Sequence, residues 1–402
     1  MILGLILGGC QSNETEAGSP NEQDAIAFYA GQPSYLQPKL PKSMPEGLTD
    51  LSAQSCGTCH TEIYAEWAAS THSWAWKDAQ FQAELHKKTP HGGEVSWMCL
   101  RCHTPSWNQL PQLVVDTSKG MDFAQTIPNP SFNAQLREEG VGCISCHLGD
   151  GVILGPTGEG NAPHPVQKSA DFLKPSLCNN CHQAEAHFPE QNLACFFSTG
   201  KEHASSPQGQ AGESCQDCHM PLVERPAALG APSRQTRRHF FGGSLIPKSS
   251  AHAEAMSQLA SDFPHGMSLS ISEDMEAKLL RIVYENTHAG HSLPSGDPER
   301  FILIRVVLSD EQGQIVDSRE IKVGAVYQWY PTIELRSDNR LAPLEKRSID
   351  LDLSHHRSGA YTLMVEAEKW RITEDNLAYH QLEGVVPPKI VFYKKSEKIT
   401  IR

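Results

Sequence analysis

One short cysteine motif occurs five times in this chain and constrains its fold more than any other feature. Each copy is Cys-x-x-Cys-His, and we number them first to fifth along the chain: residues 56–60, 99–103, 143–147, 178–182 and 215–219. The two thiols of this motif add across the vinyl groups of a c-type haem, and the histidine that follows binds the iron. Zinc also binds paired cysteines, but five half-sites cannot pair evenly and zinc does not require the adjacent histidine. The repeats therefore predict five covalently bound c-type haems.

The predicted haem-binding residues follow directly from the five motifs. The thioether positions are Cys56, Cys59, Cys99, Cys102, Cys143, Cys146, Cys178, Cys181, Cys215 and Cys218. The proximal iron ligands are His60, His103, His147, His182 and His219. Cys10 and Cys195 remain, so no disulfide framework is available unless these two residues pair. For Cys195 we expect a small buried side chain.

The beginning of the chain indicates export. Covalent haem attachment takes place outside the cytoplasmic membrane, and the apolar run that ends in Leu7-Gly8-Gly9-Cys10 resembles a bacterial lipobox. The run is too short to span a bilayer and lacks a basic start, so we interpret residues 1–10 as a lipoprotein signal with a truncated start. Cys10 would carry the lipid and anchor the protein to a membrane. The alternative is an ordinary cleaved signal with an unrelated cysteine.

Composition and the residue after Cys10 indicate the location of the protein and limit its partners. Gln11 after the cysteine favours an outer-membrane lipoprotein, on the periplasmic or the cell-surface face. Residues 11–50 are polar and rich in Gly, Ser and Pro, which predicts a flexible tether. The formal net charge of −13 argues against nucleic acid as a partner.

The character of the sequence changes after the last motif, which predicts an α+β chain of several domains. Residues 51–250 contain all five motifs and few long periodic segments, so we expect a loop-rich, mostly α pentahaem cytochrome domain. Helices are expected around Ile63–Ala68 and Ser249–Leu259. An antiparallel β-sandwich is expected over residues 267–402, with a boundary between 240 and 267. Its seven expected strands are Ser268–Ser272, Ala277–Glu285, Phe301–Leu308, Ile315–Tyr327, Ser348–Leu353, Tyr361–Trp370 and Lys389–Ile401.

The segment after the first motif carries a family resemblance. Cys56-Gly-Thr-Cys-His60 is followed by Ile63-Tyr-Ala-Glu-Trp67 and then by His72, and this resembles the opening of the cytochrome c554 family. The similarity continues through the second and third motifs, His164 and the fourth motif, over about residues 55–185. The wider group includes hydroxylamine oxidoreductase and pentahaem nitrite reductase. The fifth motif and the sandwich depart from the tetrahaem pattern, and no motif has Lys in place of His, which puts the nitrogen chemistry of the family in doubt.

The resemblance implies which histidines complete the haems. It implies that His72 is the distal ligand of the haem held by His147, and His164 that of the haem held by His60. Arg237-Arg-His239-Phe-Phe-Gly-Gly243 resembles a His-x-Phe-x-Gly segment of many multihaem cytochromes, so His239 is expected to close the fourth or fifth haem. The remaining candidates are His291, or its neighbour His288, with His187 and His203 as weaker ones, and His91 for the second haem. In the cytochrome c554 family the corresponding second haem has an open face.

Two functions from different classes remain open at this point. Five closely spaced haems with histidine on both faces favour an electron-transfer protein. Its expected partners are redox proteins such as other cytochromes or a porin-type conduit, and it could form a homo-oligomer or a haem filament. The alternative is a haem enzyme that acts on a small nitrogen or sulfur compound at one five-coordinate haem. A third possibility, a binding role for the sandwich, depends on the cluster Tyr327-Gln-Trp-Tyr330.

Overall fold

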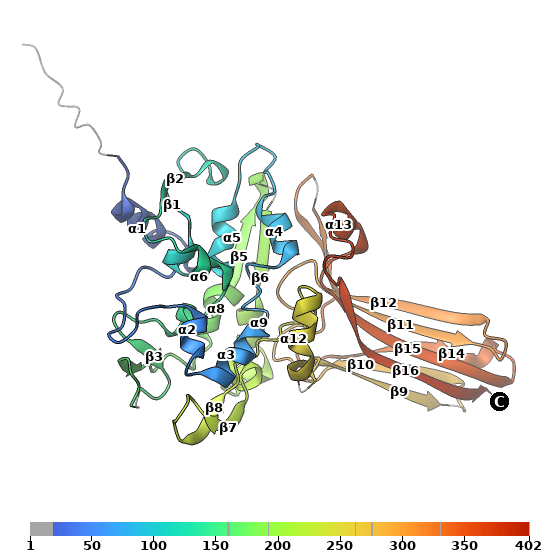
Figure 1. Cartoon of the computed structure of the whole chain (residues 1–402). Coiled ribbons are helices and arrows are strands. Elements are labelled where there is room, and N and C mark those ends of the chain that lie inside the picture. The colour runs from blue at the N-terminus through green and yellow to red at the C-terminus, as the bar shows by residue number, and fades with distance from the viewer. Residues whose placement is uncertain are drawn as a thin grey trace, which may run out of the picture.

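A computed structural model describes residues 19–158, 161–191, 193–261, 263–274, 276–329 and 331–401. Cys10 and the whole expected signal, residues 1–10, therefore lie outside the described residues. Figure 1 shows two parts side by side, an N-terminal part of short helices and small hairpins and a C-terminal part of long strands. This arrangement confirms the predicted α+β fold class with a cytochrome part followed by a sandwich.

Residues 21–50 are not a free tether, which corrects the prediction for the described part of 11–50. Helix α1 (Glu22–Ala30) begins at Asn21 with a capping box that Asp24 completes. Its buried face packs on a small core around Trp107 and Val114. The Trp107 indole donates a hydrogen bond of 3.0 Å to Glu22 Oε1. This apolar contact holds the segment against the haem part because it removes large aromatic surface from water.

The cytochrome part is built from short helices joined by loops. The expected helix after the first motif is α3 (Thr61–Ala68), and the expected one before the sandwich is α12 (Ser250–Ala260). The other helices here are α2 (Ala53–Gly57), α4 (Ala79–Leu85), α5 (Ser96–His103), α6 (Ala134–Glu138), α7 (Ile144–His147), α8 (Ser176–His182), α9 (Thr199–Ala204), α10 (Pro207–Gln210) and α11 (Cys215–His219). Single 3₁₀ turns are η1 (Ser34–Leu36), η2 (Trp107–Gln109), η3 (Met121–Phe123) and η4 (Pro189–Gln191).

Four two-stranded sheets also lie in this part, which sequence patterns alone did not predict. They pair β1 (Gln112–Asp116) with β2 (Gln125–Pro128), β3 (Ile153–Gly155) with β4 (Val166–Lys168), β5 (Ala184–Phe188) with β6 (Leu193–Phe197), and β7 (Leu222–Pro226) with β8 (Ser233–Arg237). Strands this short carry too few alternating residues to be recognised by their period. They fix the loops that run between the motifs.

The C-terminal part is a sandwich of two antiparallel sheets. One sheet has the order β14-β10-β9 and the other β13-β12-β11-β15-β16. The strands are β9 (Met267–Asp274), β10 (Leu279–Asn286), β11 (Phe301–Ser309), β12 (Ile315–Gln328), β13 (Glu334–Asp338), β14 (Lys346–Asp352), β15 (Gly359–Trp370) and β16 (Lys389–Ile401). All seven expected strands are present, and the short, exposed β13 is additional. The facing apolar side chains of both sheets form one buried core, as their alternation requires.

The two parts meet along α4, α12 and the helix α13 (Glu374–Tyr379), which follows β15 (Figure 1). At this junction the Asp78 carboxylate is buried and accepts hydrogen bonds from Lys248 Nζ at 2.8 Å and Arg371 Nη2 at 2.5 Å. Arg371 follows the last residue of β15, so the ion pairs join the sandwich to the helical part. Within the described residues, no helix is long and apolar enough to cross a membrane.

Candidate haem sites

Each motif lies at a short helix that presents its cysteines one turn apart. Helices α5, α8 and α11 end at the motif histidine, α7 also ends at it, and α2 covers the start of the first motif. No disulfide joins the eleven cysteines in the described residues. The spacing brings both thiols of a motif to one side of its histidine, as thioether bonds to one porphyrin edge need.

Hydrogen bonds orient three of the motif histidines in the same way. Nδ1 donates to a backbone carbonyl in His60 (to Ala227, 2.7 Å), His103 (to Ala75, 2.8 Å) and His147 (to Leu154, 2.8 Å). Since a carbonyl oxygen only accepts, these rings carry their proton on Nδ1. Nε2 is then left with its lone pair, which is the state that binds a metal ion.

Three of the predicted distal histidines stand opposite a motif histidine at nearly one separation. The ring centroids are 6.3 Å apart for His72 and His182, 6.2 Å for His147 and His239, and 6.3 Å for His219 and His291. Two metal–nitrogen bonds of about 2 Å each, together with half of each ring, account for such a distance. The residues present therefore fit an iron held between two imidazoles at the third, fourth and fifth motifs.

The partner of His72 differs from the one that the family resemblance implied. His72 faces His182 of the fourth motif and not His147, whose partner is His239. The exchange also corrects the expectation that His239 serves the fourth or fifth motif.

Burial keeps these opposed rings neutral. Loss of solvent lowers the pKa of His72 to about 3 and the pKa values of His219 and His239 to about 4. A neutral imidazole is the form that coordinates iron, because protonation would occupy the lone pair. The lowered pKa values and the pairwise separations therefore agree on one role.

Glu66 on α3 holds the segment that carries His239. Its buried carboxylate receives two hydrogen bonds from Arg225, at 2.9 and 2.8 Å, and one from Arg238 Nε at 3.2 Å. It also accepts the backbone N–H of His239 at 2.7 Å. These charged donors lower the pKa of Glu66 against the opposing effect of burial. No sequence signal marked Glu66, because its partners lie some 160 residues away.

His291 reaches the fifth motif from the sandwich. Its Nδ1 donates to the Ser292 carbonyl at 2.9 Å, so Nε2 is available to face His219. Glu202 on α9 ties the loop down by accepting hydrogen bonds from Ser292 N at 3.2 Å and Ser295 Oγ at 2.9 Å. The neighbouring candidate His288 is exposed and bonds to its own neighbour Thr287. The structure thus favours His291 over His288.

The first and second motifs are less complete. Nδ1 of His164 is buried and, among the described residues, has no hydrogen-bond partner, while its place opposite His60 stays a prediction. His91 is exposed and lies beside Asp122 rather than against His103. The ring that stacks on His103 is Phe81, with centroids 3.6 Å apart.

The two weaker candidates are placed differently. His203 lies near the pair formed by His219 and His291 and lowers the pKa of both rings. The side chain of His187 lies outside the described residues.

Thiols from different motifs lie next to one another. Side-chain contacts join Cys56 to Cys143, Cys102 to Cys181 and Cys178 to Cys215. These contacts connect the first motif to the third, the second to the fourth, and the fourth to the fifth. Cys146 of the third motif is also close enough to both cysteines of the fourth motif for electrostatic interaction. The fourth motif is therefore the centre of the arrangement.

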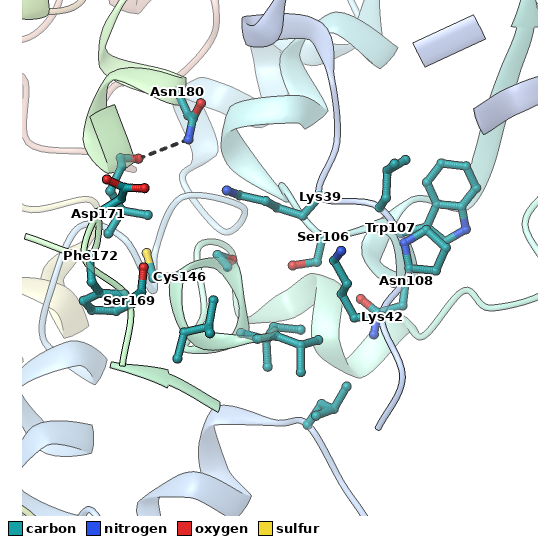
Figure 2. Close-up of a pocket in the computed structure, with 18 of the residues that line it drawn as sticks. Lys39, Lys42, Ser106, Trp107, Asn108, Cys146, Ser169, Asp171, Phe172 and Asn180 are labelled. Carbon is teal, nitrogen blue, oxygen red and sulfur yellow. Dashed lines mark hydrogen bonds between the residues drawn. The ribbon is translucent and has the colours of Figure 1, made fainter. Parts of the chain in front are cut away.

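A cavity of about 560 Å³ opens beside the third motif. Figure 2 shows Lys39 extending across it toward the side where Cys146, Phe172 and Asn180 lie. Its apolar wall and basic rim suit a group with a flat apolar ring and carboxylates, and its volume is in the range of about 300–1,000 Å³ found for cofactor sites. No group of three or more His, Cys, Asp or Glu side chains within the described ranges could hold a bare metal ion.

Comparisons with known proteins agree with this geometry. Residues 55–148 match the family described as Cytochrome c554 and c-prime. A penta-heme cytochrome c552 from Thermochromatium tepidum superposes with a TM-score of 0.59 and 16% identity, over 87% of this chain and 99% of that one. A hypothetical protein PH1083 from Pyrococcus horikoshii OT3 reaches a TM-score of 0.15 over 34% of this chain at 12% identity, which supports no argument. No curated protein matches the chain.

The repeated motifs, the opposed histidines and the shared fold define a multihaem c-type cytochrome. The chain is similar to the cytochrome c554 family through residues 55–148. Its covalently bound cofactor is c-type haem, and its general role is electron transfer. The match covers the first three motifs, whereas the fold similarity to the penta-heme cytochrome extends across the sandwich as well.

Proposed function

We propose that the chain is a pentahaem cytochrome that carries electrons through mostly bis-histidine haems. The observation that supports this most is the set of three opposed histidine pairs at 6.2–6.3 Å. A haem iron with histidine on both faces exchanges single electrons and leaves no face for a substrate. All five motifs would each hold one haem, with Cys56 and Cys218 as the first and last thioether positions.

The protein side chains supply spacing and orientation. The contacting thiols of different motifs bring the attachment points together, so that the bound groups would form one connected series with a branch at the fourth motif. Backbone carbonyls set the ring orientation of His60, His103 and His147, which leaves Nε2 toward the iron. Because such cofactors carry the redox chemistry themselves, fixing their distances and surroundings is the main task of the chain.

The proposal includes an exported lipoprotein of the outer membrane, on the periplasmic or cell-surface face. Its support is the lipobox-like Leu7-Gly8-Gly9-Cys10. Helix α1, which is capped at Asn21, follows Cys10 closely in the sequence. Ten residues between Cys10 and Asn21 span at most about 35 Å when extended, so the haem part would stay near the membrane. Suitable partners are other cytochromes or a porin-type conduit, and a homo-oligomer or filament is compatible with the proposal.

A second candidate function is a haem enzyme that acts on a small nitrogen or sulfur compound. The observation that favours it lies at the second motif, where the ring found against His103 is Phe81 and the candidate His91 is exposed. Burial is the main cause that lowers the pKa of His103. The charges of Asp78 and Lys248, which lie near the ring, also affect this pKa. An open iron face at this motif would be flanked by charged groups.

Electron paramagnetic resonance of the oxidised protein separates the two candidates. Mass spectrometry and a pyridine haemochrome assay should first give five haems per chain. The electron-transfer proposal expects low-spin signals at the third, fourth and fifth motifs that ignore cyanide and nitrite. A high-spin signal that converts on adding either ligand would assign an open haem and favour the enzyme. Fewer than five haems would overturn the pentahaem proposal.

A further inference from the structure

A cluster of four cationic side chains lies at the junction between the two parts. Arg371 and Lys369 at the end of β15 are 5% and 9% exposed, and Lys248 and Arg300 lie close by. The acidic groups within reach are Asp78 and Asp297. Buried charges are normally paired, because an unpaired one loses its hydration without compensation. Among the described residues, these four cations therefore face two carboxylates, and part of the positive charge has no carboxylate partner.

Two guanidinium groups in this cluster have unused donors. The Asp78 carboxylate accepts hydrogen bonds from Lys248 and from one nitrogen of Arg371. The other terminal nitrogen, Nη1 of Arg371, is buried without a hydrogen-bond partner in the described part of the chain. Arg300 has no hydrogen bond or ion pair to any described side chain. Its backbone N–H bonds only to the Asp297 carbonyl at 3.1 Å, as part of a turn. A guanidinium presents a flat fork of donors that matches a carboxylate.

Several contacts place Arg300 beside the fourth motif. The loop before β11 packs on the chain that follows β6, where Thr199 Oγ1 and Ser295 Oγ are 2.6 Å apart. The next residue, Gly200, lies so close to Asn179 of α8 that a Cβ there would come within 2.7 Å of its side-chain oxygen. Arg300 also lines a small cavity of about 40 Å³ between the parts, together with Ser198.

We propose that Arg300, supplied by the sandwich, is the counter-charge of a carboxylate of the haem bound at the fourth motif. The side chain forms a charge-assisted hydrogen bond with that carboxylate, and the free Nη1 of Arg371 lies in the same positive cluster. Through His291 and Arg300, the sandwich then contributes an iron ligand at the fifth motif and a charge at the fourth. This inference rests on the proposed function, because it needs a haem at His182.

The test is a spectroelectrochemical titration of the full chain with Arg300→Gln. Loss of a positive charge beside a haem carboxylate makes reduction less favourable. We expect the reduction equilibrium of one haem to shift about tenfold toward the oxidised form, which corresponds to about 59 mV for one electron. Arg300→Lys keeps the charge and should stay within about twofold of wild type. The matched control is Arg281→Gln, which removes an exposed arginine of β10 that pairs with Asp350 of β14.

The outcomes separate this inference from the proposed function. Haem content is measured first, and fewer than five haems in the wild-type protein would count against the pentahaem proposal itself. With full haem content, unchanged midpoints in Arg300→Gln, or an equal shift in Arg300→Lys, would overturn the counter-charge role. A shift that appears in wild type only on adding sulfate, and not in Arg300→Gln, would mean that a free oxyanion is the partner and would also overturn it.

A second variant tests the proposal in the case that Arg300→Gln loses haem. Arg300→His carries a charge that can be removed by raising the pH in the folded protein. The change in the midpoint potential of one haem between pH 5.5 and 8.5 should then exceed the change in wild type over the same interval. An equal response in both proteins would contradict the proposal.

Discussion

The imidazoles of His72 and His182 face each other with centroids 6.3 Å apart, although 110 residues separate them in the chain. His72 lies just after α3, close to the first motif in sequence. The fold nevertheless assigns it to the fourth motif, the one whose thiols contact those of the second and the fifth. This single pairing ties the start of the haem part to its centre.

Replacing His72 by Ala should therefore open the haem at the fourth motif and leave the third closed. The expected signal is conversion of one low-spin ferric haem to high spin, measured by electron paramagnetic resonance. His239→Ala should convert a different signal, because His239 faces His147. If both variants converted the same signal, the pairing of His72 with His182 would be wrong.

His291→Ala should open the haem at the fifth motif, since His291 faces His219 at 6.3 Å. The change is expected in the spectrum of one haem, with a rise in its midpoint potential or a new response to cyanide. The matched control is His288→Ala, which alters an exposed ring in the same loop. An equal spectral change in both variants would show that the loop, rather than the His291 ring, is responsible.

Glu66→Gln should loosen the segment around His239 and destabilise the protein by about 3 kcal/mol, because Arg225 is left buried with an incomplete partner. The pKa of Glu66 is lowered in the folded state. A depressed carboxyl pKa contributes stability above the unfolded value, near 4.5, and loses it as the pH falls. Chemical denaturation at pH 7 and pH 3.5 should show a large difference from wild type at the first pH and a smaller one at the second.

Asp78→Asn should destabilise the junction by about 3–5 kcal/mol, because the buried Lys248 and Arg371 would lose their shared carboxylate partner. Their charges hold the pKa of Asp78 at about 2 despite its burial. Its contribution is therefore present above pH 4 and declines between about pH 4 and 2. The control is Asp350→Asn, whose exposed pair with Arg281 should matter by less than about 1 kcal/mol. Similar losses in both variants, measured by urea denaturation, would contradict a role for the buried pair.

Glu299 should make the stability fall as the pH rises. Burial, followed by the charges of Asp297 and Glu84, raises the pKa of Glu299 to about 7, while Lys87 and the Asn376 amide act in the opposite direction. Between about pH 4.5 and 7 the folded state keeps a proton that the unfolded state releases, so stability decreases over this interval. Glu299→Gln should remove about 1–2 kcal/mol of that decrease. An unchanged pH profile of the melting temperature would contradict this assignment.

The sequence by itself determined the cofactor chemistry and the division into two parts. A Cys-x-x-Cys-His motif is local, so its five copies, their thiols and their histidines can be identified without a fold. The strands of the sandwich are also local in origin, because β10 and β15 show the alternation that one buried face requires. For the same reason, the short hairpins of the haem part and the docking of α1 were missed: their stability comes from distant contacts such as the one with Trp107.

Only the tertiary structure decided which histidine meets which motif. Opposed rings belong to residues 110, 92 and 72 positions apart, as the numbers of His72 and His182, His147 and His239, and His219 and His291 show. Spacing along the chain carries no information about such pairs, because they form where loops and the sandwich return to the same haem site. In the sequence, Glu66, Asp78 and Arg300 are likewise not distinguished from other charged residues, because their roles depend on where the fold places them. The physical reason is that motif chemistry is set within a few bonds, whereas ligand pairing and charge compensation depend on the packing of the whole chain.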